Sequence, residues 1–180
     1  MRSLLPPDQR LRSIQKPRPF HIVLVQPEIP PNTGNVARLC AATGCALHLV
    51  EPLGFRIDEH AVRRAGLDYW PLVELHVHES LADAEQSVRS LTARDHTRVA
   101  EGWLFSGRAT QSVFDQHLEP GDALIFGKES VGLDEALLAE RSDHVLAIPT
   151  SGPVRSLNLA NSVAIVVYEA LRKNGLTRIG

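Results

Sequence analysis

The chain has 180 residues, of which 43% are hydrophobic and 22% charged, as in a single globular domain with its own core. No apolar run approaches the ~20 residues of a membrane span, and the N-terminus lacks the apolar stretch of a secretory signal, so we expect a cytoplasmic protein. The two cysteines cannot supply four zinc ligands, and the eight histidines are scattered along the chain. We therefore expect buried thiols and no metal site.

Charge is unevenly distributed. The formal net charge is −2, but residues 1–20 carry five basic residues and one acidic residue, a net of +4, which leaves −6 for the remainder. This composition fits either a basic arm that contacts phosphate or a disordered leader rich in proline. Residues 1–20 are therefore expected to be an N-terminal extension, and residues 21–180 a single domain.

Compact apolar runs alternate with segments of helical spacing along the rest of the chain. The first half predicts strands at Ile22–Val25, Ala46–Val50 and Val73–Val77, and helices at Asn35–Thr43 (ended by Gly44), Asp58–Ala65 and from Ser80 to about Thr92. The second half predicts strands at Thr97–Phe105, Ala123–Phe126 and Val145–Ile148, and helices at Leu133–Ala139 and Ser156–Leu171. This alternation predicts an α/β fold, with a mostly parallel sheet covered by helices on both faces.

Special residues gather in three loops that follow predicted strands. These loops read "PEIPPNTGN", "GKESVG" and "PTSGPVRSLN". Ligands of such folds bind outside the carboxyl ends of the strands, so we expect the functional site there. Glu129 follows Lys128 where a phosphate-binding loop needs Ser or Thr, and no G-x-G-x-x-G is present, so nucleotide triphosphate and NAD binding are not supported.

The first of these loops leads into a helix that carries Arg38. Asn32 or Thr33 is expected to turn the chain, and Gly34 to let it reverse tightly. Arg38 is either an ordinary exposed arginine or a group that grips phosphate or a developing oxyanion. Ser156 is expected to cap the last helix, while Asn158 either assists the cap or holds a polar ligand.

The strings "NTGNVAR", "IFGKESVGL" and "IPTSGPVRSLNLANSVAIVVYEA" resemble, in order and spacing, the three motifs of the SPOUT class of RNA methyltransferases. The stretches "PEIPPNTGNVARLCAATG", "EPLGF" and "RRAGLDYW" are similar to one branch, the small tRNA 2′-O-methyltransferases that act on the wobble nucleotide of the anticodon. The similarity runs from about His21 to the end. It implies one SPOUT-like methyltransferase domain with a C-terminal trefoil knot, S-adenosylmethionine as cofactor, a tRNA substrate and a homodimer with the site at the subunit interface.

The resemblance also implies roles for individual residues. Cofactor contacts fall on Phe105, Gly127, Ile148 and Ser156, with Glu129, Pro149 and Leu157 close by. Arg38 is the expected catalytic residue, with Asn32 and Asn158 holding the loop, the cofactor or the ribose. Substrate contacts are expected at Arg63, Arg64 and Arg155, with Tyr69 and Trp70 as stacking surfaces for bases. The alternative for Arg63, Arg64, Tyr69 and Trp70 is a dimer contact or packing within the fold.

Two alternatives remain open at this point. The chain is either a methyltransferase for another RNA site or a non-catalytic RNA-binding protein on the same fold. The basic extension departs from the compact members of the branch, and Phe105 stands where a smaller aliphatic residue is common. Neither departure removes a motif residue.

Overall fold

A computed structural model describes residues 11–13, 16–55, 70–154 and 156–178. Its strands are β1 (His21–Val25), β2 (Ala46–Val50), β3 (Leu75–His78), β4 (Gly102–Phe105), β5 (Gln111–Ser112), β6 (Ala123–Phe126) and β7 (Val145–Ala147). They form one sheet in the order β3-β2-β1-β6-β4-β7-β5, in which every paired strand is parallel. The parallel α/β fold is thus confirmed, and the trefoil knot stays a prediction.

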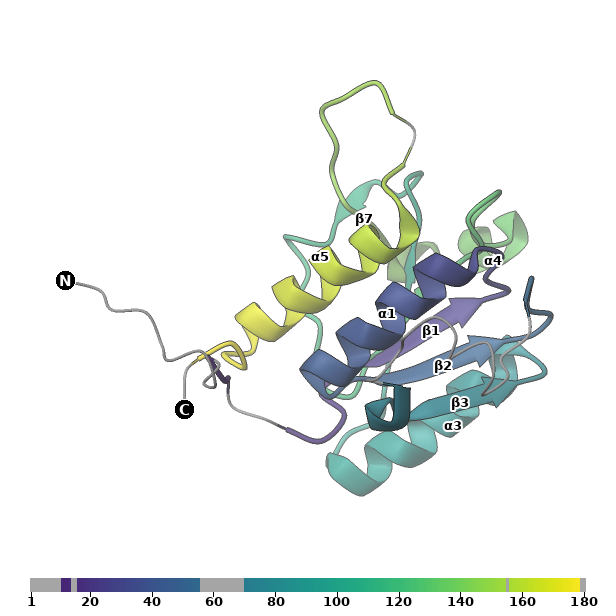
Figure 1. Cartoon of the computed structure of the whole chain (residues 1–180). Coiled ribbons are helices and arrows are strands. Elements are labelled where there is room, and N and C mark those ends of the chain that lie inside the picture. The colour runs from purple at the N-terminus through teal and green to yellow at the C-terminus, as the bar shows by residue number, and fades with distance from the viewer. Residues whose placement is uncertain (1–10, 14–15, 56–69, 155, 179–180) are drawn as a thin grey trace.

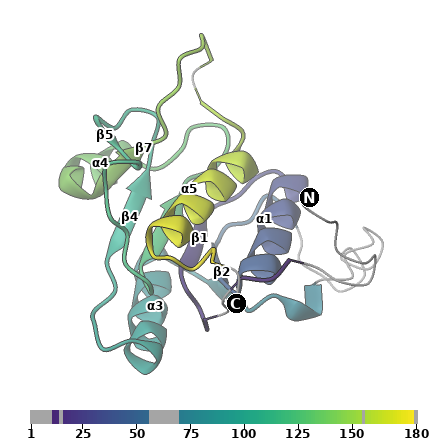
Figure 2. The same cartoon turned by 90° about the vertical axis from the view of Figure 1, so that its left-hand side faces the viewer.

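Helices cover both faces of this sheet (Figures 1 and 2). They are α1 (Pro30–Thr43), α3 (Leu81–Asp95), α4 (Glu135–Glu140) and α5 (Leu159–Lys173), with short 3₁₀ turns η1 (Trp70–Leu72) and η2 (Ser142–His144). Alternate residues of β1 enter different cores: Ile22 and Leu24 pack under α1 and α5, whereas Val23 packs under α3 and α4. This period of two is what a strand buried on both faces requires.

Helix α1 begins earlier than the sequence predicted. It starts at Pro30 rather than Asn35, and a proline fits there because the first helical position needs no backbone donor. The expected turn at Asn32 or Thr33 and the tight reversal at Gly34 are therefore wrong, since all three residues lie inside the first turns of α1. The predicted end is confirmed: Gly44 adopts φ 74° and donates its N–H to Cys40 O.

Helix α5 begins later than predicted. Asn158, not Ser156, is its N-cap, and the Asn158 side chain accepts from the N–H groups of Ala160 and Asn161 at 3.0 and 3.3 Å. The capping role assigned to Ser156 is thus wrong, because the carboxamide two residues later satisfies the exposed donors of the first turn. Strand β5 was not predicted, since two residues show no periodicity. The helix predicted at 58–65 lies outside the described residues.

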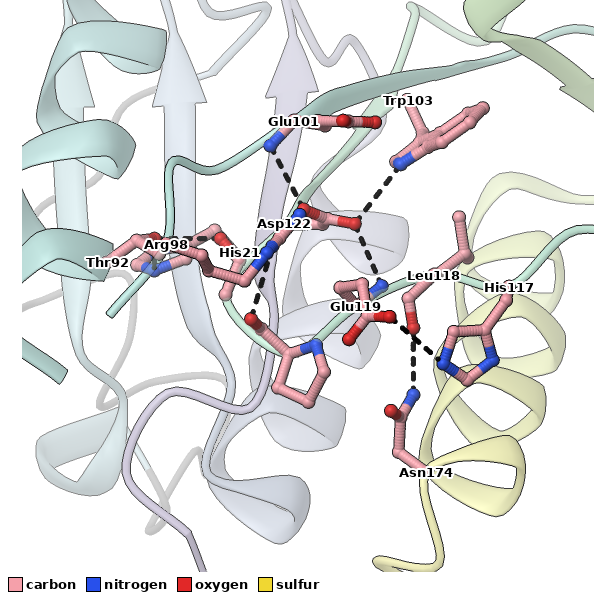
Figure 3. A network of polar contacts seen from close by, with 12 residues as sticks. His21, Thr92, Arg98, Glu101, Trp103, His117, Leu118, Glu119, Asp122 and Asn174 are labelled. Atoms are coloured by element: carbon pink, nitrogen blue, oxygen red, sulfur yellow. Dashed lines mark hydrogen bonds and ion pairs between the residues drawn. The ribbon is translucent and has the colours of Figure 1, made fainter. Parts of the chain in front are cut away.

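A buried carboxylate, that of Asp122, collects hydrogen bonds at the amino ends of the strands, directly before β6 (Figure 3). The Asp122 carboxylate is 2% exposed and accepts from Arg98, Glu101 N, Trp103 Nε1 and Glu119 N. Four donors around one buried carboxylate fix this edge of the sheet.

Four histidines that are scattered along the sequence come together in the fold. His21, His48, His76 and His78 gather on the α3 face of neighbouring strands, with His48 stacked on both His76 and His78. The parallel register aligns His48 with His76, which the sequence alone did not reveal. Cys40 and Cys45 are buried free thiols, as expected, and burial raises the pKa of Cys45 to about 11.

The end of the N-terminal extension is attached to the body. Phe20 is fully buried, and Arg18 forms ion pairs of 2.7 Å with both Glu74 and Asp95. The charge of Arg18 is thereby matched inside the protein. Among the described residues, no helix is long and apolar enough to cross a membrane.

Candidate active site

Three neighbouring strands end at the edge where the sequence predicted a site. Phe105 is the last residue of β4 and Phe126 the last of β6, and their rings stack with centroids 4.6 Å apart. Gly127 follows β6 directly, and Ile148 follows β7 directly. The order β6-β4-β7 brings Phe105, Gly127 and Ile148 together, although they are far apart in the chain.

The loop after β6 has a fixed internal shape that depends on glycine. A Cβ atom on Gly127 would lie 2.1 Å from Gly132 C and 2.3 Å from Leu133 N, so no side chain fits there. Lys128 and Gly132 form an isolated bridge, in which Gly132 N–H donates to Lys128 O at 2.8 Å. Gly132 has φ 79°, which completes the tight return of the chain.

Hydrogen bonds join the loops after β1, β6 and β7. Asn32 is 6% exposed, and its side-chain amide donates to Glu129 Oε1 at 2.9 Å. The amide of Asn158 donates to Asn32 Oδ1 at 3.0 Å. Glu129 also accepts from the backbone N–H groups of Glu28 and Ile29, at 2.8 and 3.3 Å. Glu129, Asn32 and Asn158 therefore form a continuous link across the site.

Sequence reasoning missed Glu28 and Ser130, which add a second link. Ser130 donates from its backbone N–H and from its hydroxyl to the Glu28 carboxylate, both at 3.0 Å. Lys128 Nζ lies 3.4 Å from Gln26 Oε1. Two adjacent loops that each carry a glutamate at the same edge of a sheet were the available signal.

The remaining predicted residues are less tightly placed. Arg38 is an exposed residue of α1, the helix whose first turn contains Asn32. Pro149 and Ser156 are exposed and Leu157 is half-buried, in a segment between β7 and α5 that extends away from the sheet in Figure 1. Arg63, Arg64, Tyr69 and Arg155 lie outside the described residues.

Trp70 lies in η1 and packs against the core beneath α1. Packing within the fold, one of the alternatives for Trp70, thus accounts for the buried part of this side chain. A cavity lined by Ser106, Arg108, Glu135 and Leu138 lies beside α4 and contains none of the predicted site residues. Among the residues that the structure describes, no three His, Cys, Asp or Glu side chains are grouped to hold a metal ion.

The strand-end surface fits a nucleoside cofactor. Adenine needs an apolar surface and backbone hydrogen-bonding groups. At this edge Ile148 is half-buried beside the backbone of the loops that follow β4, β6 and β7, while the stacked Phe105 and Phe126 rings belong to the core. A parallel sheet with three linked loops at one edge and an arginine on the adjoining helix is the arrangement that the resemblance to the SPOUT class of methyltransferases implies.

The chain belongs to the SpoU rRNA Methylase family, whose model matches residues 19–168. A tRNA (cytidine(34)-2′-O)-methyltransferase of Burkholderia pseudomallei is 45% identical over 157 residues, which cover 87% of this chain and 96% of the relative. The enzyme of the same name from Acidovorax sp. is 47% identical over 160 residues, covering 86% and 92%.

Solved structures agree with this assignment. One structure, from work on the 2-OH methylation of C/U34 on tRNA, is 47% identical with a TM-score of 0.75, covering 86% of this chain and 95% of its own. The SpoU methyltransferase AviRb of Streptomyces viridochromogenes, in complex with AdoMet, has a TM-score of 0.70 at 24% identity, covering 97% of this chain and 64% of its own. At that identity the second likeness shows the fold alone.

Proposed function

We propose that this protein transfers a methyl group from S-adenosylmethionine to the ribose 2′-hydroxyl of the wobble nucleotide, cytidine or uridine, in tRNA anticodons. The observation that carries the proposal is the link of Glu129, Asn32 and Asn158, which joins all three motif loops at the strand ends. The relatives named above support the choice of substrate, because they match nearly their whole length.

The cofactor site comprises the strand ends and the loops that follow them. Phe105, Gly127 and Ile148 contribute the surface for the nucleoside, with Glu129, Pro149, Ser156 and Leu157 around it. When bound, S-adenosylmethionine supplies an electrophilic methyl group on a sulfonium. The chain's own task is to hold that group in line with the 2′-oxygen, and well-oriented reactants lower a barrier by about 7–11 kcal/mol.

Arg38 acts on the nucleophile. Loss of the hydroxyl proton leaves negative charge on the 2′-oxygen, and this oxygen would then attack the methyl group that bound S-adenosylmethionine supplies. A guanidinium keeps its own protons, so it stabilises that charge rather than accepting the proton. Water or an RNA phosphate takes the proton. Asn32 and Asn158 position the loops around this reaction, since both are engaged in the link described above.

The protein works on tRNA as a cytoplasmic homodimer in this proposal. Helix α5 exposes Ile165 and Tyr168, two apolar side chains one turn apart that suit a contact with a second copy. Arg63, Arg64 and Arg155 are proposed to meet RNA phosphates. With a net charge of only −2 for the whole chain, RNA binding depends on such local positive charge and weakens with added salt.

The test is to incubate the full chain with labelled S-adenosylmethionine and total tRNA or ribosomal RNA, and to map methylated nucleosides by mass spectrometry. We expect 2′-O-methylation at the wobble position of tRNA. Transfer to another nucleotide would leave the enzyme class standing but exclude the anticodon substrate. The absence of transfer to any RNA would exclude the enzyme and favour a binding protein.

Arg38→Ala tests the catalytic assignment. We expect kcat to fall more than about tenfold, the equivalent of ~1.4 kcal/mol in the barrier, with cofactor affinity and melting temperature nearly unchanged. Arg38→Lys keeps the charge but loses the planar fork and should be intermediate. Arg89→Ala, an exposed arginine of α3, is the matched control. Turnover of Arg38→Ala within a few-fold of that control would exclude the role.

A further inference from the structure

In two loops of the candidate site, a glutamate of each loop accepts hydrogen bonds from the other loop. Glu28, in the loop between β1 and α1, accepts from Ser130 N–H and from the Ser130 hydroxyl at 3.0 Å each. In return Glu129, beside Ser130, accepts from Glu28 N–H at 2.8 Å. Each loop thus supplies a carboxylate to backbone donors of the other.

The backbone of Glu28 is also held from its other side. Gly54, in the loop after β2, donates its N–H to Pro27 O at 2.9 Å. A Cβ atom on Gly54 would lie 2.8 Å from both Glu28 Cα and Glu28 O, so the two chains are in close backbone contact. Glu28 therefore sits between the loop after β2 and the loop after β6, with little freedom to move toward the former.

We propose that Glu28 is a positioning residue that sets the placement of the loop after β6 against the start of α1. The proposal rests on the function proposed above, because α1 carries Arg38 and the loop after β6 carries Gly127. By holding Ser130, Glu28 would fix the distance between the helix that acts on the ribose and the strand end that faces the cofactor. In this proposal Glu28 acts through Ser130 and not by contact with either reactant.

One observation separates this role from ordinary stabilisation. Glu28 and Ser130 are both exposed, and exposed polar contacts contribute little to the free energy of unfolding. A loss of Glu28 should therefore change loop placement far more than it changes stability.

The internal shape of the loop after β6 does not depend on Glu28. The Lys128–Gly132 bridge and the close packing of Gly127 on Gly132 lie within the loop itself. Without the Glu28 carboxylate this loop should keep its form, and its attachment to the start of α1 would be reduced to the contacts of Glu129. Cofactor affinity should accordingly change little while turnover falls, a split that a general loss of folding would not produce.

The experiment compares full-length wild type with Glu28→Ala, Glu28→Gln, Ser130→Ala and the double variant Glu28→Ala/Ser130→Ala. Glu140→Ala, an exposed glutamate at the end of α4, is the matched control. The readouts are kcat and KM for tRNA, the Kd of S-adenosylhomocysteine, the melting temperature and amide hydrogen exchange of a peptide covering residues 127–133.

For Glu28→Ala we expect kcat to fall about tenfold or more, with the Kd of S-adenosylhomocysteine within about threefold of wild type and little change in melting temperature. Glu28→Gln keeps one acceptor oxygen and should recover part of the turnover. The double variant should be no worse than Glu28→Ala, because both substitutions remove the same contact. Exchange in residues 127–133 should accelerate in Glu28→Ala and not in Glu140→Ala.

Turnover of Glu28→Ala equal to that of Glu140→Ala would overturn the proposal, as would losses that simply add in the double variant. A wild type that methylates no RNA would instead refute the proposed function. Hydrogen exchange would then decide the placement role by itself, since it requires no turnover. Unchanged exchange in Glu28→Ala would exclude that role whatever the activity.

Discussion

Acidification should destabilise this fold through a chain of buried histidines. Thr92 Oγ1 donates to Gly121 O at 2.8 Å, so its oxygen can only accept from His21 Nε2, 3.4 Å away. His21 Nδ1 must then accept from His48 Nε2 at 3.0 Å, and His48 Nδ1 from His78 Nε2 at 3.0 Å. The Thr92 hydroxyl thus sets the direction of every hydrogen bond in this row of histidines. It requires His21 and His48 to be neutral Nε2–H tautomers.

Burial is the main cause that lowers the pKa of His21 to about 4 and that of His48 to about 2. The other charged or titratable groups around the chain are Arg18, Glu74, His76, Asp83 and Asp95. In the unfolded protein both histidines titrate near 6.5. Stability is therefore complete above pH 6.5 and falls as the pH decreases, because the unfolded chain then binds two protons that the folded chain excludes.

The expected loss follows from that difference in bound protons. Each proton changes the free energy of unfolding by about 1.4 kcal/mol per pH unit, so two protons over about two pH units below 6.5 amount to about 5 kcal/mol. This is comparable to the entire stability of many domains. Most of this loss occurs above about pH 4.5. Glutamates with lowered pKa values, such as Glu28, take up protons only below that pH.

Urea unfolding at about pH 7 and about pH 4.5, followed by circular dichroism, measures this loss. His48→Gln should lose about half as much between the two pH values as wild type, because one of the two titrating groups is removed. His117→Gln, which replaces an exposed histidine, is the control and should behave as wild type. Imidazole nitrogen shifts measured by NMR should show Nε2–H tautomers. A wild-type free energy that changes by less than about 1 kcal/mol would refute the reasoning.

Three further predictions concern other parts of the molecule. Asp122→Asn should lower the free energy of unfolding by roughly 2–3 kcal/mol in urea titrations, because a carboxamide cannot serve all four donors. Gly127→Ala should weaken S-adenosylhomocysteine binding at least about tenfold in calorimetry, whereas Gly152→Ala, whose added Cβ meets nothing within 4 Å, should not. Ile165→Glu should convert the proposed homodimer to a monomer in sedimentation, whereas Val99→Glu, which replaces an exposed valine between α3 and β4, should not.

Much of the fold could be read from local sequence because its strands are buried on both faces. Ala46–Val50 was predicted with its observed bounds, since a short, mostly apolar run between Gly44 and Pro52 has few other interpretations. The same reasoning predicts where the candidate site lies. Once parallel strands are inferred, the loops after them must lie at one edge, and that is where Phe105, Gly127 and Ile148 meet.

The start of α1 could not be read in this way, because its cap is not local. Ile29 occupies the N-cap position and has no side-chain oxygen to offer. The Glu129 carboxylate, a hundred residues away in sequence, accepts from Ile29 N–H instead. Pro30, Pro31 and Asn32 therefore predict a turn when only the neighbouring residues are considered. The histidine chain escaped prediction for a similar reason, since it exists only in the register of three strands.

That distant cap has a consequence for the active site. Because Glu129 belongs to the loop after β6, the helix that carries Arg38 begins where this loop places it. The position of the arginine relative to the strand ends is thus set by contacts between loops. The contacts that fix the sheet lie elsewhere, at the amino ends of the strands around Asp122. Substitutions in the loops should therefore impair turnover while sparing stability, and substitutions around Asp122 should do the reverse.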